Sequence, residues 1–174
     1  MRIAAGLVLV AAVFATSCSS DSSPSQTGTP GKAPSFTAVL SPANEVPGVT
    51  NSESGASGTA TVTFITTKDS AGNITAATCE FAVSMKGFPA GTLVTAAHVH
   101  EGATGINGGI KINTAVSSGD SVVSNGAGAI NTAGINVTPD LVNAILANPA
   151  GYYFNVHTQA NGGGVMRGQL VRNN

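Results

Sequence analysis

Short segments in which apolar and polar residues alternate recur along the chain from residue 35 onwards. Phe36–Leu40, Thr59–Phe64 and Ile74–Met85 carry apolar side chains at every second position, the period of a β-strand with one buried face. Turn-forming residues separate these segments, as in the Asp-Ser-Ala-Gly-Asn run at residues 69–73. Short strands at fairly regular intervals predict an all-β domain over residues 35–174, an antiparallel β-sandwich or barrel.

The second half of the chain is predicted to contain one helix and further strands. Pro139–Ala147 has a helical period, with Thr138 as N-cap and proline at the first helical position. Its apolar stripe consists of Leu141, Val142, Ile145 and Leu146. We expect this helix to cover an end or an edge of the sandwich. The other predicted strands are Leu93–Glu101, Ile110–Thr114, Ser121–Ser124, Ala127–Ile130, Tyr152–Thr158 and Val165–Val171.

The three histidines of the chain all lie in two of these predicted strands. His98 and His100 are two residues apart, so both point to the same face of their strand. The same rule groups Asn155 with His157 on one face of Tyr152–Thr158. Both strands are apolar on the opposite face, which marks their polar faces as a candidate site.

The N-terminal residues have the features of a secretory signal. Arg2 precedes an uncharged run, Ile3–Phe14, that is shorter than the about 20 residues a membrane-spanning helix needs. The Ala-Thr-Ser-Cys that follows resembles a bacterial lipobox, which predicts removal of residues 1–17 and lipidation of Cys18. The alternative is ordinary signal cleavage close to an unmodified Cys18.

Residues 18–34 are predicted to form a disordered tether. They consist largely of Ser, Thr, Pro and Gly, which bury too little apolar area to offset the entropy of ordering. Ser19 follows the cysteine, and we therefore expect a lipid anchor in the outer membrane of a diderm cell rather than retention at the inner membrane. The predicted location is the bacterial cell envelope, with the domain outside the cytoplasm.

Charge and cysteine content exclude several classes of function. Without residues 1–17 the chain has six Lys and Arg against eight Asp and Glu, a formal charge of −2, and no basic surface for nucleic acid. If Cys18 is lipidated, Cys79 is the only thiol left, so no intramolecular disulfide is expected. Alternation places Cys79 among apolar residues, which predicts a packed side chain rather than a nucleophile. No nucleophile elbow, phosphate-binding loop or pair of catalytic carboxylates occurs, which favours a non-enzymatic protein.

Several motifs resemble those of the CHRD domain, a repeat first noted in chordin and found singly in many bacterial secreted proteins. The family's opening strand and Asn-Glu-Val-Pro, its Ala-His-Ile-His before a glycine loop, and its terminal hairpin all have counterparts in the same order. The matching segments are Phe36–Leu40, Asn44–Pro47, Ala97–His100, Gly102–Gly109, Tyr152–Thr158 and Gly164–Leu170. The resemblance covers nearly the whole domain and implies a Greek-key sandwich, immunoglobulin-like or Cu/Zn superoxide dismutase-like.

Two positions depart from the family pattern. Gly162 replaces a turn proline, and Val165 replaces an acid, which removes one carboxylate from the neighbourhood of the histidines. The resemblance implies use in secreted assemblies but no particular activity. A fainter likeness to Cu/Zn superoxide dismutase covers only residues 98–102, and that enzyme's dinuclear centre needs more histidines than this chain has.

The predicted site combines five strand residues with one loop residue on a single polar face. These are Glu45, His98, His100, Asn155, His157 and Arg167. One hypothesis is a buried hydrogen-bond network that fixes strand register, with Arg167 paired to Glu45 or Glu101. The other is a metal site, because three imidazoles can hold Zn²⁺ or Cu²⁺ with water as the fourth ligand. The sequence therefore leaves two classes open: a non-enzymatic extracellular module that binds protein, glycan or matrix, and a metal-binding protein or metalloenzyme.

Overall fold

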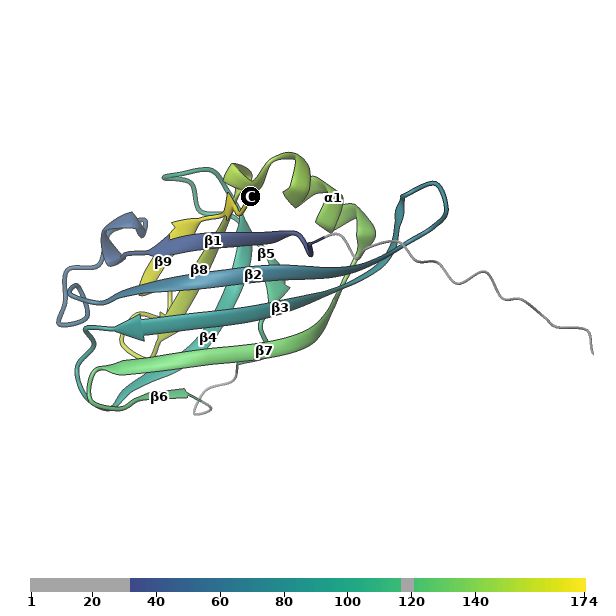
Figure 1. Ribbon diagram of the computed structural model, residues 1–174. Helices are drawn as coiled ribbons and strands as arrows, with labels where there is room; N and C mark the ends of the chain where they lie inside the picture. Colours follow the sequence, from purple (N-terminus) through teal and green to yellow (C-terminus); the bar gives the residue numbers. More distant parts are fainter. Residues whose placement is uncertain (1–31, 117–120) are drawn as a thin grey trace, which may run out of the picture. The chain divides into compact units, whose positions relative to one another are not determined.

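The computed structural model describes residues 32–116 and 121–174, which form two antiparallel β-sheets (Figure 1). Sheet 1 has the order β10-β1-β2-β3-β7 and sheet 2 has the order β5-β4-β8-β9, with β6 also paired to β4. Sheet 1 contains β1 (Ser35–Leu40), β2 (Ser57–Lys68), β3 (Ile74–Lys86), β7 (Ala127–Val137) and β10 (Val171–Arg172). Sheet 2 contains β4 (Thr92–Glu101), β5 (Ile110–Asn113), β6 (Ser121–Val123), β8 (Tyr152–Thr158) and β9 (Met166–Gln169).

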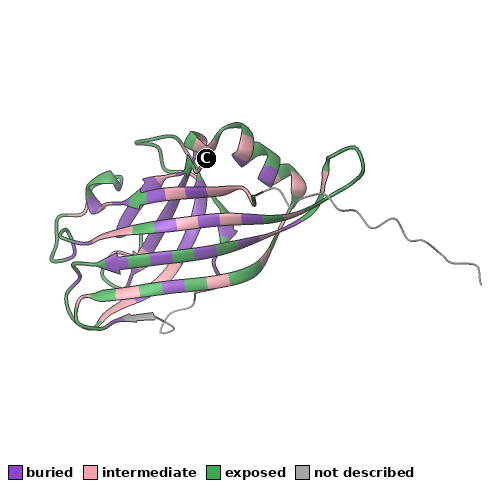
Figure 2. Cartoon of the chain, viewed as in Figure 1, coloured by how far each residue is buried: buried purple, intermediate pink, exposed green. Residues whose placement is uncertain are grey.

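The two sheets pack face to face around one hydrophobic core. Phe81 of β3 and Phe154 of β8 meet in this core, with ring centroids 5.8 Å apart. Buried and exposed residues alternate along the strands of sheet 1 (Figure 2), which is the pattern that the sequence predicts. Strands distant in sequence are neighbours, as in β3–β7 and β4–β8, which is typical of Greek-key connections. The prediction of an all-β antiparallel sandwich is therefore confirmed.

A single α-helix, α1 (Pro139–Ala147), occurs in the described part of the chain, and it has the predicted bounds. The Leu141 N–H donates to Thr138 Oγ1 at 3.3 Å, so Thr138 caps the helix as its sequence position predicts. Val142 and Ile145 are fully buried, and the helix contacts β3. The helix thus buries its apolar stripe against the sandwich.

The structure differs from the sequence-based expectation at β7, which continues to Val137 instead of ending at Ile130. Its pairing with β3 shifts register in the middle of the strand, where Gly134 has a φ of +74°. Such a bulge interrupts the two-residue period, so the pattern alone ends the strand too early. Two short 3₁₀ helices that the sequence does not predict, η1 (Pro42–Asn44) and η2 (Pro149–Gly151), lead into the site.

Sheets 1 and 2 meet along one side of the sandwich, where β9 runs beside the end of β1. Ser41 and Arg167 exchange two backbone hydrogen bonds there, of 3.1 and 3.3 Å. A side chain at Gly168 would place its Cβ 2.2 Å from the Val39 carbonyl oxygen. Only glycine permits so close an approach, which fixes Arg167 beside the loop that follows β1.

The predicted signal and the lipidation site Cys18 lie outside the described residues, as does most of the predicted tether. Among the residues that the structure describes, no helix combines the length and the apolar character needed to cross a bilayer.

Candidate functional site

The outer face of sheet 2 carries five of the six predicted site residues. Backbone pairing places Asn155 of β8 directly opposite His98 of β4 on one side and Arg167 of β9 on the other. His100 lies in the next row, opposite Tyr153. Because side chains alternate between faces, these residues point away from the core as predicted. The sequence thus identified the face, and the pairing of β4, β8 and β9 determines which residues are neighbours.

Loops cover this polar face and bury most of it. His98 and His100 are each 8% exposed, Asn155 is 3% exposed, and His157 is partly exposed. Arg167 points away from the core, yet it is only 1% exposed. A polar group removed from water in this way needs a partner, which makes the contacts of each side chain informative.

The three imidazoles converge on one point. His98 Nδ1 and His157 Nε2 are 3.1 Å apart, and one ring nitrogen from each of the three histidines lies within 4.8 Å of the others. The ring centroids of His98 and His100 are 5.5 Å apart, and those of His100 and His157 are 6.0 Å apart. In the register of β4 and β8, the His98–Asn155 pair lies between the pair that contains His100 and the pair that contains His157. The rings of His100 and His157 therefore lean towards each other over this middle pair.

Backbone carbonyl groups fix the orientation of two of the rings. The His100 Nδ1–H donates to the Gly108 carbonyl oxygen at 3.0 Å, and the His157 Nδ1–H donates to the Gly162 carbonyl oxygen at 3.0 Å. Because a carbonyl only accepts, both rings carry their proton on Nδ1 when neutral and present the Nε2 lone pair. Nε2 of His100 is buried and has no hydrogen-bond partner. Histidines that ligate metals are commonly held in this way.

Burial keeps the histidines unprotonated. Loss of solvent, together with the smaller effects of the neighbouring His157 and His100, lowers the pKa of His98 to about 4. The pKa of His100 is also lowered, chiefly by burial and in addition by the charge of Arg167, against the effect of the Gly108 carbonyl. Burial likewise lowers the pKa of His157. At neutral pH all three rings are therefore in the form that binds a metal ion.

Glu45 reaches the polar face from the loop after η1 and binds Asn155. The Asn155 Nδ2 group donates to Glu45 Oε1 at 2.9 Å and to Oε2 at 3.1 Å. Burial raises the pKa of Glu45 to about 7, although Arg167 and Asn155 both lower it. Gly164 packs on this contact, since a Cβ there would lie 2.7 Å from Asn155 Nδ2 and 2.8 Å from each Glu45 oxygen. The carboxylate and the amide are therefore held tightly against each other.

Arg167 does not form the ion pair expected from the sequence. Its Nε donates to the Asn44 carbonyl at 2.8 Å and its Nη1 donates to Asn107 Oδ1 at 2.9 Å. Its guanidinium carbon lies 4.3 Å from the centroid of the Tyr153 ring, and Tyr153 stacks on His100 with centroids 4.9 Å apart. Arg167 thus leans along β9 onto an aromatic ring and onto loop carbonyls. The expected alternative partner, Glu101, pairs instead with Lys111 at 2.7 Å.

Glu53 is a buried acid that the sequence analysis missed. It is 4% exposed, and Thr158 Oγ1 donates to its Oε2 at 2.6 Å. Asn161 Nδ2 donates to the same oxygen at 2.5 Å. These bonds tie the loop before β2 to the turn that carries Gly162, the partner of His157. A single acid within a run of Ser and Gly was the one signal available for it in the sequence.

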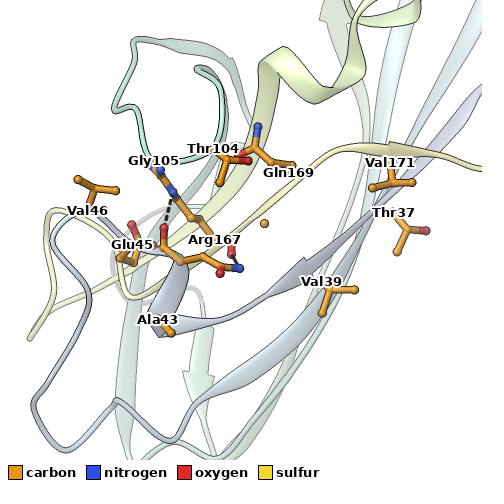
Figure 3. A pocket seen from close by; sticks show the side chains of 12 residues that line it. Thr37, Val39, Ala43, Glu45, Val46, Thr104, Gly105, Arg167, Gln169 and Val171 are labelled. Carbon is orange, nitrogen blue, oxygen red and sulfur yellow. Dashed lines mark hydrogen bonds between the residues drawn. The ribbon is translucent and has the colours of Figure 1, made fainter.

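A groove of about 650 Å³ opens beside Arg167, where sheets 1 and 2 meet (Figure 3). Val39 and Val171 lie on one side of it, and Val46 lies on the other. These three are among six exposed large apolar residues in the part of the chain that the structure describes. The groove is thus an apolar feature next to the polar face.

Both hypotheses for the histidines remain compatible with parts of this geometry. A hydrogen-bond network accounts for the contact between His98 and His157, but it leaves three buried atoms without a partner: His100 Nε2, Asn155 Oδ1 and Arg167 Nη2. A metal ion accounts for the convergence of the rings and for the free Nε2 of His100. Val165, where the family has an acid, is fully buried in the hydrophobic core.

Comparison with known proteins identifies the domain family of the chain but no individual relative. Neither the curated proteins nor the solved structures include a match to it. The model of the CHRD domain matches residues 36–170, from the second residue of β1 to the residue that follows β9, and the protein therefore belongs to the CHRD domain family.

Proposed function

We propose that this protein is a non-enzymatic extracellular module that binds Zn²⁺ or Cu²⁺ through His98, His100 and His157. The observation that carries the proposal is the convergence of one nitrogen from each ring within 4.8 Å. A tetrahedral zinc ion with Zn–N bonds of about 2.0–2.1 Å holds its nitrogen ligands about 3.3 Å apart. His98 Nδ1 and His157 Nε2 are already 3.1 Å apart, so small side-chain rotations bring the set to that spacing.

The ligand chemistry supports Zn²⁺ and Cu²⁺ over harder cations. Imidazole nitrogen suits zinc and copper, whereas Ca²⁺ and Mg²⁺ take oxygen ligands. Both Nδ1–H groups that anchor the rings donate to backbone carbonyls, so the site is oriented before an ion arrives. Three neutral imidazoles release no net proton when the metal binds, although His98 must first move its proton from Nδ1, which donates to His157 Nε2, to its own Nε2.

Metal titration of the full chain, prepared without a polyhistidine tag, tests the proposal. All three histidines of the protein belong to this cluster, so nitrogen coordination seen by spectroscopy of bound Cu²⁺ can be assigned to it. We expect one ion per chain at micromolar concentration and a higher melting temperature when the ion is bound. No binding by the wild-type chain at micromolar Zn²⁺ or Cu²⁺ would end the proposal.

Replacement of His157 by Ala separates the metal site from a purely structural network. A metal site predicts loss of stoichiometric binding and of the metal-dependent rise in melting temperature. A structural network predicts a cost of about 1–3 kcal/mol in the free energy of unfolding, with or without metal, because the His98 Nδ1–H loses its acceptor. Glu101→Gln is the matched control: this carboxylate follows His100 closely in sequence but pairs with Lys111, and its replacement should leave metal binding unchanged.

We also propose that the domain is displayed at the bacterial cell envelope through a lipid on Cys18. The proposal rests on the sequence of residues 1–18, in which a short apolar run leads to small residues and a cysteine. A lipid anchor and a secreted domain would place the histidines where extracellular metal ions are available.

The groove beside Arg167 favours a second candidate, an apolar side chain of an extracellular protein partner. Its exposed large apolar lining residues are all valines, which match an aliphatic side chain better than a sugar. Methyl NMR of the full chain during titration with short aliphatic peptides tests this. We expect shifts confined to Val39, Val46 and Val171, and shifts spread over the surface or absent would rule the candidate out.

A further inference from the structure

Asn155 lies opposite His98 on the face that carries the histidines, and only one end of its side-chain amide has a hydrogen-bond partner. Its Nδ2 group donates to both oxygens of Glu45, whereas its Oδ1 is buried and has no hydrogen-bond partner. A buried acceptor that has lost its hydrogen bonds to water and gained none in return destabilises the folded state. A ligand that donates to Oδ1 would remove that cost.

The orientation of the Asn155 amide follows from its partner. An ionised carboxylate can only accept, so above the pKa of Glu45, which is about 7, the NH₂ end must face Glu45 and the carbonyl end must face away from it. Gly164 packs against this contact so closely that a Cβ there would clash with both partners. Asn155 Oδ1 is therefore held as an acceptor on the same face as the imidazoles, directly beside His98 in the register of β4 and β8.

The ligand set of the cluster is incomplete for a tetrahedral ion. Three histidines offer one nitrogen each, and within the described residues no cysteine, aspartate or glutamate joins them in the group. A tetrahedral ion held by three protein ligands keeps its fourth position for an exchangeable molecule.

Resting on the metal site proposed above, we propose that Asn155 Oδ1 selects the molecule in the fourth position, accepting a hydrogen bond from a protic oxygen ligand. The class is water, an alcohol or a hydroperoxide, each of which binds the metal through oxygen and donates its O–H to Asn155. An anion such as azide binds metals well but cannot donate. It displaces the water without replacing the hydrogen bond and therefore loses affinity.

Cobalt substitution of the full, untagged chain tests this selection, with azide as the competing ligand. The comparison is between the wild-type chain and Asn155→Leu at pH 8, above the pKa of Glu45. Leucine has nearly the shape of asparagine but neither donates nor accepts a hydrogen bond. We expect both proteins to bind one Co²⁺, and azide to bind about tenfold more tightly to Asn155→Leu, the equivalent of one hydrogen bond. Equal azide affinity in the two proteins would overturn the selection by Asn155.

A second measurement on the wild-type chain does not depend on the folding of a variant. The ¹³Cγ resonance of Asn155 should shift when Zn²⁺ binds, because Oδ1 gains a donor, and it should shift back when azide replaces water. A resonance unaffected by zinc overturns the inference but leaves metal binding intact. A folded Asn155→Leu variant that binds no Co²⁺ also overturns it, since Asn155 would then be a metal ligand itself. Failure of the wild-type chain to bind either metal would refute the proposed function and this inference together.

Discussion

Replacement of Glu45 by glutamine tests how the polar face of sheet 2 is held together. Glu45 is 7% exposed, and burial raises the pKa of its carboxyl group from 4.5 to about 7. Between these two values the folded protein keeps the proton while the unfolded chain releases it, so stability falls as pH rises. Each pKa unit corresponds to about 1.4 kcal/mol, and the full effect on the free energy of unfolding is about 3 kcal/mol.

Glutamine resembles the protonated carboxyl group and does not titrate. Glu45→Gln should therefore match the wild type in stability near pH 4.5 and exceed it by about 3 kcal/mol at pH 8. The three histidines titrate in the opposite sense: their lowered pKa values contribute stability above pH 6.5 that is lost as pH falls towards about 4, the pKa of His98. Both proteins contain these histidines, so their effect cancels in the difference.

Urea unfolding of the metal-free proteins at pH 4.5, 6, 7 and 8 measures this difference. Glu80→Gln, at an exposed position on β3, is the matched control and should change stability by less than about 0.5 kcal/mol throughout. A difference between Glu45→Gln and wild type that stays constant with pH would refute the reasoning. So would a variant that is less stable at pH 8, since the attraction of Arg167 would then exceed the cost of burying the carboxylate.

Three further predictions follow from close contacts and from the N-terminal sequence. Gly164→Ala should lower the free energy of unfolding, measured in urea, by at least about 2 kcal/mol, because the φ of Gly164 is +133° and a Cβ there would meet Asn155 and Glu45. The control Gly163→Ala should be nearly neutral, because a Cβ at Gly163 would have no atom within 4 Å. Gly108→Ala should weaken Zn²⁺ binding, measured by calorimetry, because the new Cβ would lie 1.5 Å from the Glu101 carbonyl oxygen and would displace the Gly108 carbonyl that holds His100. The control Gly109→Ala should leave Zn²⁺ binding unchanged, because a Cβ at Gly109 would lie in open space. Mass spectrometry of the mature protein should find an acylated Cys18 at the N-terminus, and an unmodified N-terminus at another residue would contradict the lipid anchor.

Local sequence was sufficient for the strands, the helix and the polar face. The two-residue period is a property of the extended backbone, so the sequence alone indicates that His98 and His100 share a face. The cap at Thr138 and the apolar stripe of α1 are equally local, and the helix has its predicted bounds. Where a bulge broke the period, as at Gly134 in β7, the same reasoning ended the strand too early.

Tertiary structure decided which polar groups meet, because those contacts join strands and loops that are far apart in sequence. The pairing of β4 with β8 brings His157 to His98, and the approach of β9 to β1 at Gly168 turns Arg167 towards loop carbonyls and Tyr153 rather than towards an acid. The buried role of Glu53 depends on a turn more than 100 residues later. A one-dimensional pattern states which face a side chain occupies, whereas its partner across that face depends on the register of neighbouring strands and on the loops that fold over them.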